Sequence, residues 1–290
     1  MEETNIANYA DDNSLYAVDN DVPHLLLKLQ NETNVALNWF YLNEMKPNAE
    51  KCHVIICNQP TLSVKLEDTV LQTEKSVELL GVTIDKNLNF SDHISNLCKR
   101  ANQKLHALTR ISRYIDQNKL KLLMRAFVTS QFSFCPLVWM FHSRTLNNKI
   151  DKLHERALRV VYKNQNLTFE ELLEKDNSVT IHQRNLQNLA IEMYKIKHKL
   201  SPKPMQELFD QTVHLYNLRN KPQWKSNSVR TVGYGVETIS FMGAKIWEMI
   251  PDNIKLSSSL PVFKHKIKLW KTTKCPCRLC RTYIKDLGFL

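Results

Sequence analysis

The sequence of 290 residues has only five glycines, and a single one of them, Gly81, precedes residue 233. Because glycine adopts the backbone conformations of tight turns most readily, this scarcity indicates that the first two hundred residues are rich in helix and that Asn, Asp, Ser and Pro form the turns. No stretch reaches the roughly 20 consecutive apolar residues of a membrane span, and no apolar run follows a basic N-terminal start. We therefore expect an intracellular protein, in the cytoplasm or the nucleus, with no membrane partner.

Cysteines are few and odd in number. Of the seven, Cys52, Cys57, Cys98 and Cys135 lie within apolar patterns, where a reduced thiol behaves as a small hydrophobic side chain. Intracellular compartments keep thiols reduced. The sequence therefore predicts no disulfide framework.

Acidic side chains are concentrated at the start of the chain, although the net charge is +11. Residues 1–93 carry 15 acidic and 6 basic side chains, a net charge of −9, whereas residues 94–163 carry a net charge of +11 and residues 164–290 one of +9. A basic excess of this size attracts polyanions, of which nucleic acid is the usual one. A solvated face that keeps the protein soluble is the alternative interpretation.

A predicted β-hairpin near the N-terminus carries two adjacent carboxylates. Its strands are residues 5–9 and 14–18, with Asp11, Asp12 and Asn13 at the tip. Neighbouring side chains of a strand point to opposite faces, whereas a turn lets both carboxylates approach one cation. Carboxylates are the hard ligands that Mg²⁺ prefers, and nucleotidyl transfer typically uses two such ions. Ordinary turn chemistry is the more frequent reason for an Asp-Asp pair at a hairpin tip.

The rest of the first third mixes one helix with strands. Helical spacing of apolar residues predicts a helix from the caps Asp19 and Asp21 to about residue 46. Three strands are then predicted at 54–57, 62–66 and 77–84. This part of the chain is therefore predicted to be α+β.

After residue 91 the pattern is helical. Apolar stripes predict helices at 94–111, 120–128, 146–161 and 181–199, and shorter ones near 244–249 and 263–271. The aromatic side chains of residues 132–141 are expected in a buried cluster rather than stacked on bases. Basic residues interleave two of the stripes and are the candidate nucleic-acid ligands, namely Lys99, Arg100, Lys104, Arg110, Lys149, Lys152, Arg156 and Arg159.

The order of these motifs resembles the C-terminal part of the reverse transcriptases of jockey-like and related non-LTR retrotransposons, over nearly the whole chain. Tyr9-Ala10-Asp11-Asp12 matches the third motif of the polymerase palm in that family, a hairpin whose first aspartate binds metal. Asn48-Ala49-Glu50-Lys51 resembles the family's Asn-x-x-Lys motif, which implies that Lys51 acts as a general acid toward pyrophosphate. A surface lysine beside Glu50 is the alternative.

Two later segments extend the resemblance. The run from Leu79 to Asp85 resembles the strand pair that grips the primer end, which implies Leu80, Gly81 and Val82 as the primer grip. The basic helices match the thumb, which holds the template-primer duplex by its backbone. The resemblance thus implies an α+β fold. A partial polymerase palm (β-hairpin, helix, small antiparallel sheet) with the primer grip is expected at 1–90, a basic, mainly α-helical thumb at 91–200, and an irregular and partly helical C-terminal region with a cysteine-rich basic tail at 201–290.

Only eight residues precede Tyr9, so the resemblance implies that the fingers, the earlier palm motifs and the other metal-binding aspartate lie outside this sequence. Asp11 and Asp12 then supply an incomplete Mg²⁺ site. We expect a fragment of an RNA-directed DNA polymerase that is inactive by itself, with an RNA template, a DNA primer and the missing palm and fingers part as partners. A non-catalytic nucleic-acid-binding protein derived from the element is the alternative, and a protein-interaction module is a third hypothesis.

The remaining three cysteines form a cluster near the C-terminus, Cys275-Pro276-Cys277-Arg278-Leu279-Cys280. Structural zinc usually takes four ligands in two separated pairs, so Cys275, Cys277 and Cys280 are candidate zinc ligands that lack a fourth partner. His265 is a candidate for that partner. Reduced or redox-sensitive thiols in a basic tail are the alternative interpretation.

Overall fold

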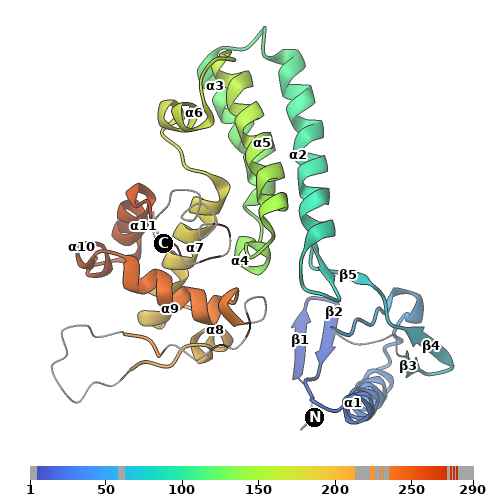
Figure 1. Cartoon of the computed structure of the whole chain (residues 1–290). Helices are drawn as coiled ribbons and strands as arrows, with labels where there is room; N and C mark the ends of the chain where they lie inside the picture. The colour runs from blue at the N-terminus through green and yellow to red at the C-terminus, as the bar shows by residue number, and fades with distance from the viewer. Residues whose placement is uncertain are drawn as a thin grey trace. The chain divides into compact units, whose positions relative to one another are not determined.

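The computed structural model describes residues 5–57, 63–212, 223–225, 229, 231, 235–272, 275, 277 and 279. The chain divides into two compact units, Met1–Phe90 and Ser91–Leu290, which we call the N-terminal and the C-terminal unit. Figure 1 labels the helices and strands of both. The N-terminal unit mixes strands and one long helix, whereas the described elements of the C-terminal unit are almost all helical, so the fold is α+β.

The N-terminal unit begins with the antiparallel hairpin of β1 (Asn5–Tyr9) and β2 (Asp12–Tyr16). The second strand therefore starts two residues earlier than predicted, because a tight two-residue turn joins the strands. The helix α1 (Val22–Leu42) follows, and the Asp21 carboxylate accepts a hydrogen bond from the His24 backbone N–H at its start. This N-cap satisfies one of the free backbone donors of the first turn, as the sequence predicts.

Two more antiparallel hairpins follow in this unit, β3 (Ser63–Leu66) with β4 (Thr69–Gln72) and β5 (Ser76–Leu79) with β6 (Val82–Asp85). The sequence did not predict β4, and the predicted strand at 54–57 is wrong, because only Val54 forms a bridge there. The run predicted at 77–84 is interrupted by a turn.

Helix α1 supplies a side chain that completes the edge of β3. The Gln30 amide donates to the Lys65 carbonyl at 2.8 Å, and the Gln30 side-chain oxygen accepts from the Lys65 N–H at 2.8 Å. One glutamine thus pairs both backbone groups of Lys65 at an exposed position of the strand edge.

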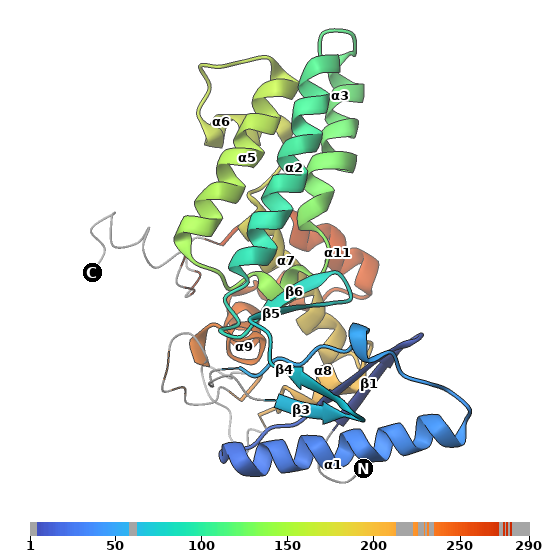
Figure 2. The same cartoon turned by 90° about the vertical axis from the view of Figure 1, so that its right-hand side faces the viewer.

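The first half of the C-terminal unit is a helical bundle. Its members are α2 (Ser91–Ile111), α3 (Gln117–Leu123), the π-helical turn η2 (Met124–Val128), the 3₁₀ turn η3 (Thr129–Phe132), α4 (Pro136–Trp139), α5 (Arg144–Tyr162) and α6 (Phe169–Asp176). Both views show α2 and α5 side by side, and the two helices are in contact (Figures 1 and 2). The apolar stripes predicted on them are buried, except for Val160, which is partly exposed, and Ile111, which is exposed. Phe132 and Trp139 of the aromatic run are also buried, whereas Phe134 is exposed.

Asp176, at the end of the unpredicted helix α6, joins three helices of the bundle. Its buried carboxylate lies 2.8 Å from the Lys121 amine of α3 and accepts a hydrogen bond at 2.8 Å from the Tyr162 hydroxyl of α5. Burial works against the charged form, but the hydrogen bonds from Lys121 and Tyr162 hold the pKa of Asp176 below its ordinary value.

The second half of the C-terminal unit forms an apolar core, which Met140 from the end of α4 joins. Helices α9 (Ile239–Met249) and α11 (Leu260–Leu269) pack on α7 (Ile181–Lys197), and the short helices α8 (Lys203–Glu207) and α10 (Asp252–Lys255) complete the set. Tyr194 of α7 stacks on Phe263 of α11 with ring centroids 4.4 Å apart, and Trp247 of α9 is buried beside them. None of the helices in the described ranges has the length and apolar character that crossing a membrane requires.

Candidate functional site

The hairpin of β1 and β2 presents the two carboxylates that the sequence singles out. Ala10 and Asp11 form the turn, and Asp12 is the first residue of β2, paired with Tyr9. The prediction that Asp11, Asp12 and Asn13 share the tip is therefore wrong by one position, because the turn has only two residues. Ala10 has a φ of 52°, and Asn13 donates a side-chain hydrogen bond to the Asp11 carbonyl at 3.2 Å.

Both carboxylates face solvent. Within the part of the chain that the structure describes, no third His, Cys, Asp or Glu joins Asp11 and Asp12 in a metal-binding group. Two carboxylates satisfy only part of the octahedral shell of Mg²⁺, so the donor set fits one side of such an ion.

Lys51 is the last residue of a short 3₁₀ helix, Ala49–Lys51. The Asn48 side chain caps the start of this helix, where it accepts a hydrogen bond from the Glu50 N–H at 3.0 Å. Lys51 is exposed to solvent. The asparagine of the Asn-x-x-Lys motif thus has a local structural task, which is to fix the turn that carries the lysine. The role of Lys51 as a general acid stays a prediction.

The three residues predicted as primer grip lie at the turn between β5 and β6. Leu80 and Gly81 form that turn with φ of 48° and 81°, a conformation that suits the right-handed twist of a two-residue hairpin. Leu80 and Gly81 are exposed, and Val82 is buried. The hairpin therefore offers an apolar tip, and Val82 anchors it in the unit.

The basic residues of α5 lie along one face of that helix. Lys149, Lys152, Arg156 and Arg159 follow one another at steps of three and four residues, opposite the buried stripe. The first three are exposed. Arg159 is half-buried, pairs with Glu155 at 2.6 Å and donates to the Gln165 carbonyl at 2.6 Å, so it closes the end of the helix.

The basic residues of α2 fall on two ridges. Lys99 and Arg110 lie three helical turns apart on one ridge, whereas Arg100 and Lys104 lie on a second ridge about 100° further round the helix. All four are exposed, and α2 has no acidic residue after Asp92.

A direct contact joins the basic face of α5 to α2. The Arg156 guanidinium donates to the Asn102 side-chain oxygen at 3.1 Å. Asn102 lies three residues after Lys99, which places the ridge of Lys99 and Arg110 on the same side as the basic face of α5. We call the set Lys99, Arg110, Lys149, Lys152 and Arg156 the basic ridge.

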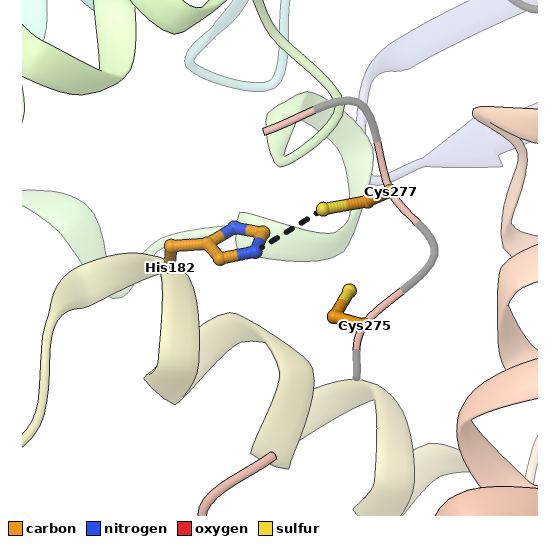
Figure 3. A group of neighbouring side chains, drawn as sticks. All are labelled: His182, Cys275 and Cys277. Carbon is orange, nitrogen blue, oxygen red and sulfur yellow. Dashed lines mark hydrogen bonds between the residues drawn. The ribbon is translucent and has the colours of Figure 1, made fainter. Parts of the chain in front are cut away.

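The structure also brings two of the three predicted C-terminal cysteines together with a histidine that the sequence did not indicate. Figure 3 shows His182, near the start of α7, with its ring directed at Cys277, and Cys275 beside them. The His182 Nε2 lies 3.4 Å from the Cys277 Sγ, and one ligand atom of each of the three residues lies within 4.8 Å of the other two. Both cysteines are buried, and neither forms a disulfide.

The other residues considered for this group have different positions. His265 is exposed on α11 and is not a member of the group, so His182 replaces it as the histidine of the cluster. Cys280 lies outside the described residues. Sequence spacing could not find His182, because 93 residues separate it from Cys275.

Comparison with known proteins confirms the resemblance that the motifs indicate. The chain is 25% identical over 168 residues to a probable RNA-directed DNA polymerase from transposon BS, and 26% identical over 166 residues to the RNA-directed DNA polymerase from mobile element jockey, both from Drosophila melanogaster. Each similarity covers 54% of this chain, less than the motifs suggest, and the matched part amounts to 18% of each relative. No protein-family model matches the chain. No solved structure matches it either.

Proposed function

We propose that this chain is part of an RNA-directed DNA polymerase of a non-LTR retrotransposon, and that its C-terminal unit holds the template-primer duplex. The basic ridge on α2 and α5 is the observation that carries the proposal, together with the similarity to the two transposon polymerases. A thumb binds the duplex by its phosphates, and a row of exposed Lys and Arg without base-reading side chains is suited to that task.

The N-terminal unit would contribute part of the polymerase active site. Asp11 and Asp12 are exposed hard ligands that would hold Mg²⁺ only together with groups supplied by the rest of the polymerase. When bound, the ions lower the pKa of the attacking hydroxyl and neutralise charge on the phosphates. Lys51 would donate a proton to pyrophosphate, and the tip formed by Leu80 and Gly81 would touch the primer end.

Duplex binding by the C-terminal unit can be tested with a fluorescent RNA–DNA hybrid. In the triple variant Lys149→Glu, Lys152→Glu, Arg156→Glu, we expect affinity to fall at least tenfold at low salt. We also expect the slope of log affinity against log salt to shrink by roughly 0.9 for each lost phosphate contact. The matched control is Lys203→Glu, Lys264→Glu, Lys268→Glu, which changes the net charge equally at exposed lysines of α8 and α11.

The two triple variants distinguish a binding face from a general charge effect. We expect the control to stay within about threefold of the unchanged chain, because distant charges are screened. Equal losses in both variants, or no binding of the unchanged chain at low salt, would contradict the proposal.

Polymerase chemistry needs a separate test, because the chain spans 18% of its relatives. In a jockey polymerase in which this chain replaces the corresponding segment, we expect primer extension with Mg²⁺ that Asp11→Ala abolishes while duplex binding is retained. The isolated chain should extend no primer. Asp11-independent extension by the chimera would sink the assignment of the hairpin.

A further inference from the structure

We propose that His182, Cys275 and Cys277 form a site for a zinc-like divalent ion that fastens the cysteine-bearing segment to the start of α7. The proposal goes beyond the polymerase function, since nothing in duplex binding or nucleotidyl transfer requires an ion at this place. It rests on the donor types, on their separations and on the contacts that deliver the segment to α7.

The donor types and separations suit the ion. Zinc takes thiolate sulfur at about 2.3 Å and imidazole nitrogen at about 2.0 Å, so ligand atoms of a tetrahedral site lie roughly 3.5 to 3.8 Å apart. The 3.4 Å between the His182 Nε2 and the Cys277 Sγ is just below that spacing, and the third atom lies within 4.8 Å of both. Figure 3 shows the three side chains converging from two segments of the chain. A fourth position is left for water or another donor.

Two glutamines of α7 bring the segment to this place. The Gln183 amide donates to the Trp270 carbonyl at 3.1 Å, and the Gln187 amide donates to the carbonyls of Lys268 and Trp270 at 3.1 and 2.9 Å. These carbonyls lie at the end of α11, where a helix leaves acceptors without intrahelical donors. Because Gln183 follows His182 directly and Cys275 lies five residues after Trp270, the same contacts that hold the end of α11 also direct the cysteines toward His182.

Two other interpretations of the cluster, a catalytic Cys-His pair and a disulfide, fit the structure less well than a metal site. Cys275 and Cys277 are almost inaccessible, whereas a catalytic Cys-His pair must reach a substrate. A disulfide between the two cysteines would close a loop of three residues and would remove the thiol that the His182 imidazole contacts. A metal ion uses all three donors at once.

Metal analysis of the full chain tests the proposal. After purification with zinc and removal of free metal, we expect about one zinc ion per chain. Replacing zinc by Co²⁺ should give the visible bands of a tetrahedral ion and a near-ultraviolet sulfur-to-cobalt band. Removing one thiolate, by Cys275→Ser or Cys277→Ser, should reduce the sulfur-to-cobalt band to about half.

A matched pair of double variants isolates the site. Cys275→Ser with Cys277→Ser should lose the ion and lower the midpoint of thermal unfolding to that of the chelator-treated chain. Cys57→Ser with Cys135→Ser removes two exposed thiols and should keep both ion and midpoint. Binding that survives the first pair, or is lost equally in the second, overturns the proposal.

The histidine needs its own variants, because His182→Ala can fail simply by misfolding. His182→Cys keeps a ligand at this position, so we expect it to bind Co²⁺ with a stronger sulfur-to-cobalt band than the unchanged chain. His182→Ala should bind weakly with circular dichroism unchanged. A cobalt spectrum that is the same in all three chains would show that His182 is not a ligand and would overturn the site as proposed.

Discussion

The two units of this molecule bury their large apolar side chains to different extents. On α1 of the N-terminal unit, Trp39 is 55% exposed and Leu42 is 75% exposed, whereas on α9 of the C-terminal unit Trp247 is 1% exposed. Among its described residues, the N-terminal unit has three separate two-stranded hairpins and one long helix, and a two-stranded hairpin is only marginally stable by itself. The described long helices of the C-terminal unit bury continuous apolar faces.

The difference teaches that composition alone does not make a core. Helix α1 is more apolar than α2, yet α1 buries only Leu37 among its apolar residues, whereas α2 buries its apolar stripe from Ile94 to Leu108. Apolar surface that stays exposed over a helix and along hairpin edges is typical of a face that another element covers. This agrees with the proposal that the N-terminal unit is one part of a larger polymerase palm.

The largest expected effect comes from truncating one tryptophan in each unit. Trp247→Ala should lower the free energy of unfolding of the C-terminal unit by about 3–5 kcal/mol, because it leaves a cavity in a packed core. Trp39→Ala should change the free energy of unfolding of the N-terminal unit by less than about 1 kcal/mol, since truncating an exposed side chain removes few contacts. Urea unfolding followed by circular dichroism measures both.

The tryptophan pair can also break the comparison. Equal losses in the two variants would mean that Trp39 is packed in solution and that the N-terminal unit closes a core of its own. The Trp247 variant also loses the hydrogen bond from its Nε1 to the Gln223 side chain at 2.8 Å. Gln223→Ala removes this bond without the cavity, and we expect it to cost about 1–3 kcal/mol because the buried indole N–H loses this acceptor.

The sequence predicted the long helices better than the strands, and the reason is the length of the pattern. The stripe on α2 repeats over six turns, so one ambiguous residue does not change the assignment. The strands have four or five residues each, and a turn of two residues decides where they begin. The turn at Ala10 carries no glycine signal, and the second strand was therefore predicted two residues late.

The candidate site shows the same limit. Basic residues three or four apart could be placed on one face of α5 from the sequence alone, because a helix fixes that geometry locally. The partner of Cys277 could not be predicted, since His182 reaches it only through the packing of α11 on α7. Local spacing predicts faces, and tertiary packing decides which of them meet.

A second, smaller effect should appear in the C-terminal unit on acidification. His154 of α5 is buried beside Phe169, and burial lowers its pKa from 6.5 to about 4, with a further contribution from Arg184 that Asp176 opposes. The unfolded chain binds a proton near pH 6.5 and the folded chain does not, so this contribution to stability is present above pH 6.5 and is lost as the pH falls toward 4.

The expected loss is on the order of 1–3 kcal/mol between pH 7 and pH 4. His154→Gln cannot titrate, so its urea unfolding should depend less on pH than that of the unchanged chain. His106→Gln, at an exposed position of α2, is the control and should keep the full dependence. The same pH dependence in the His154 variant and the unchanged chain would exclude His154 as its source.

The smallest effect concerns the scarcity of glycine, which forces other residues into left-handed backbone conformations in both units. Lys163 ends α5 with a φ of 50°, and Ala10 holds the first hairpin turn with a φ of 52°. Glycine accepts this conformation without the Cβ penalty, which is worth roughly 0.5–1 kcal/mol after its larger unfolded-state entropy is subtracted.

Lys163→Gly should therefore raise the urea midpoint of the C-terminal unit. Ala10→Gly should leave that midpoint unchanged and instead slow amide hydrogen exchange in β1 and β2. If Ala10→Gly raised the midpoint of the C-terminal unit as well, the two units would unfold together, and the contrast between them would concern their surfaces and not their stability.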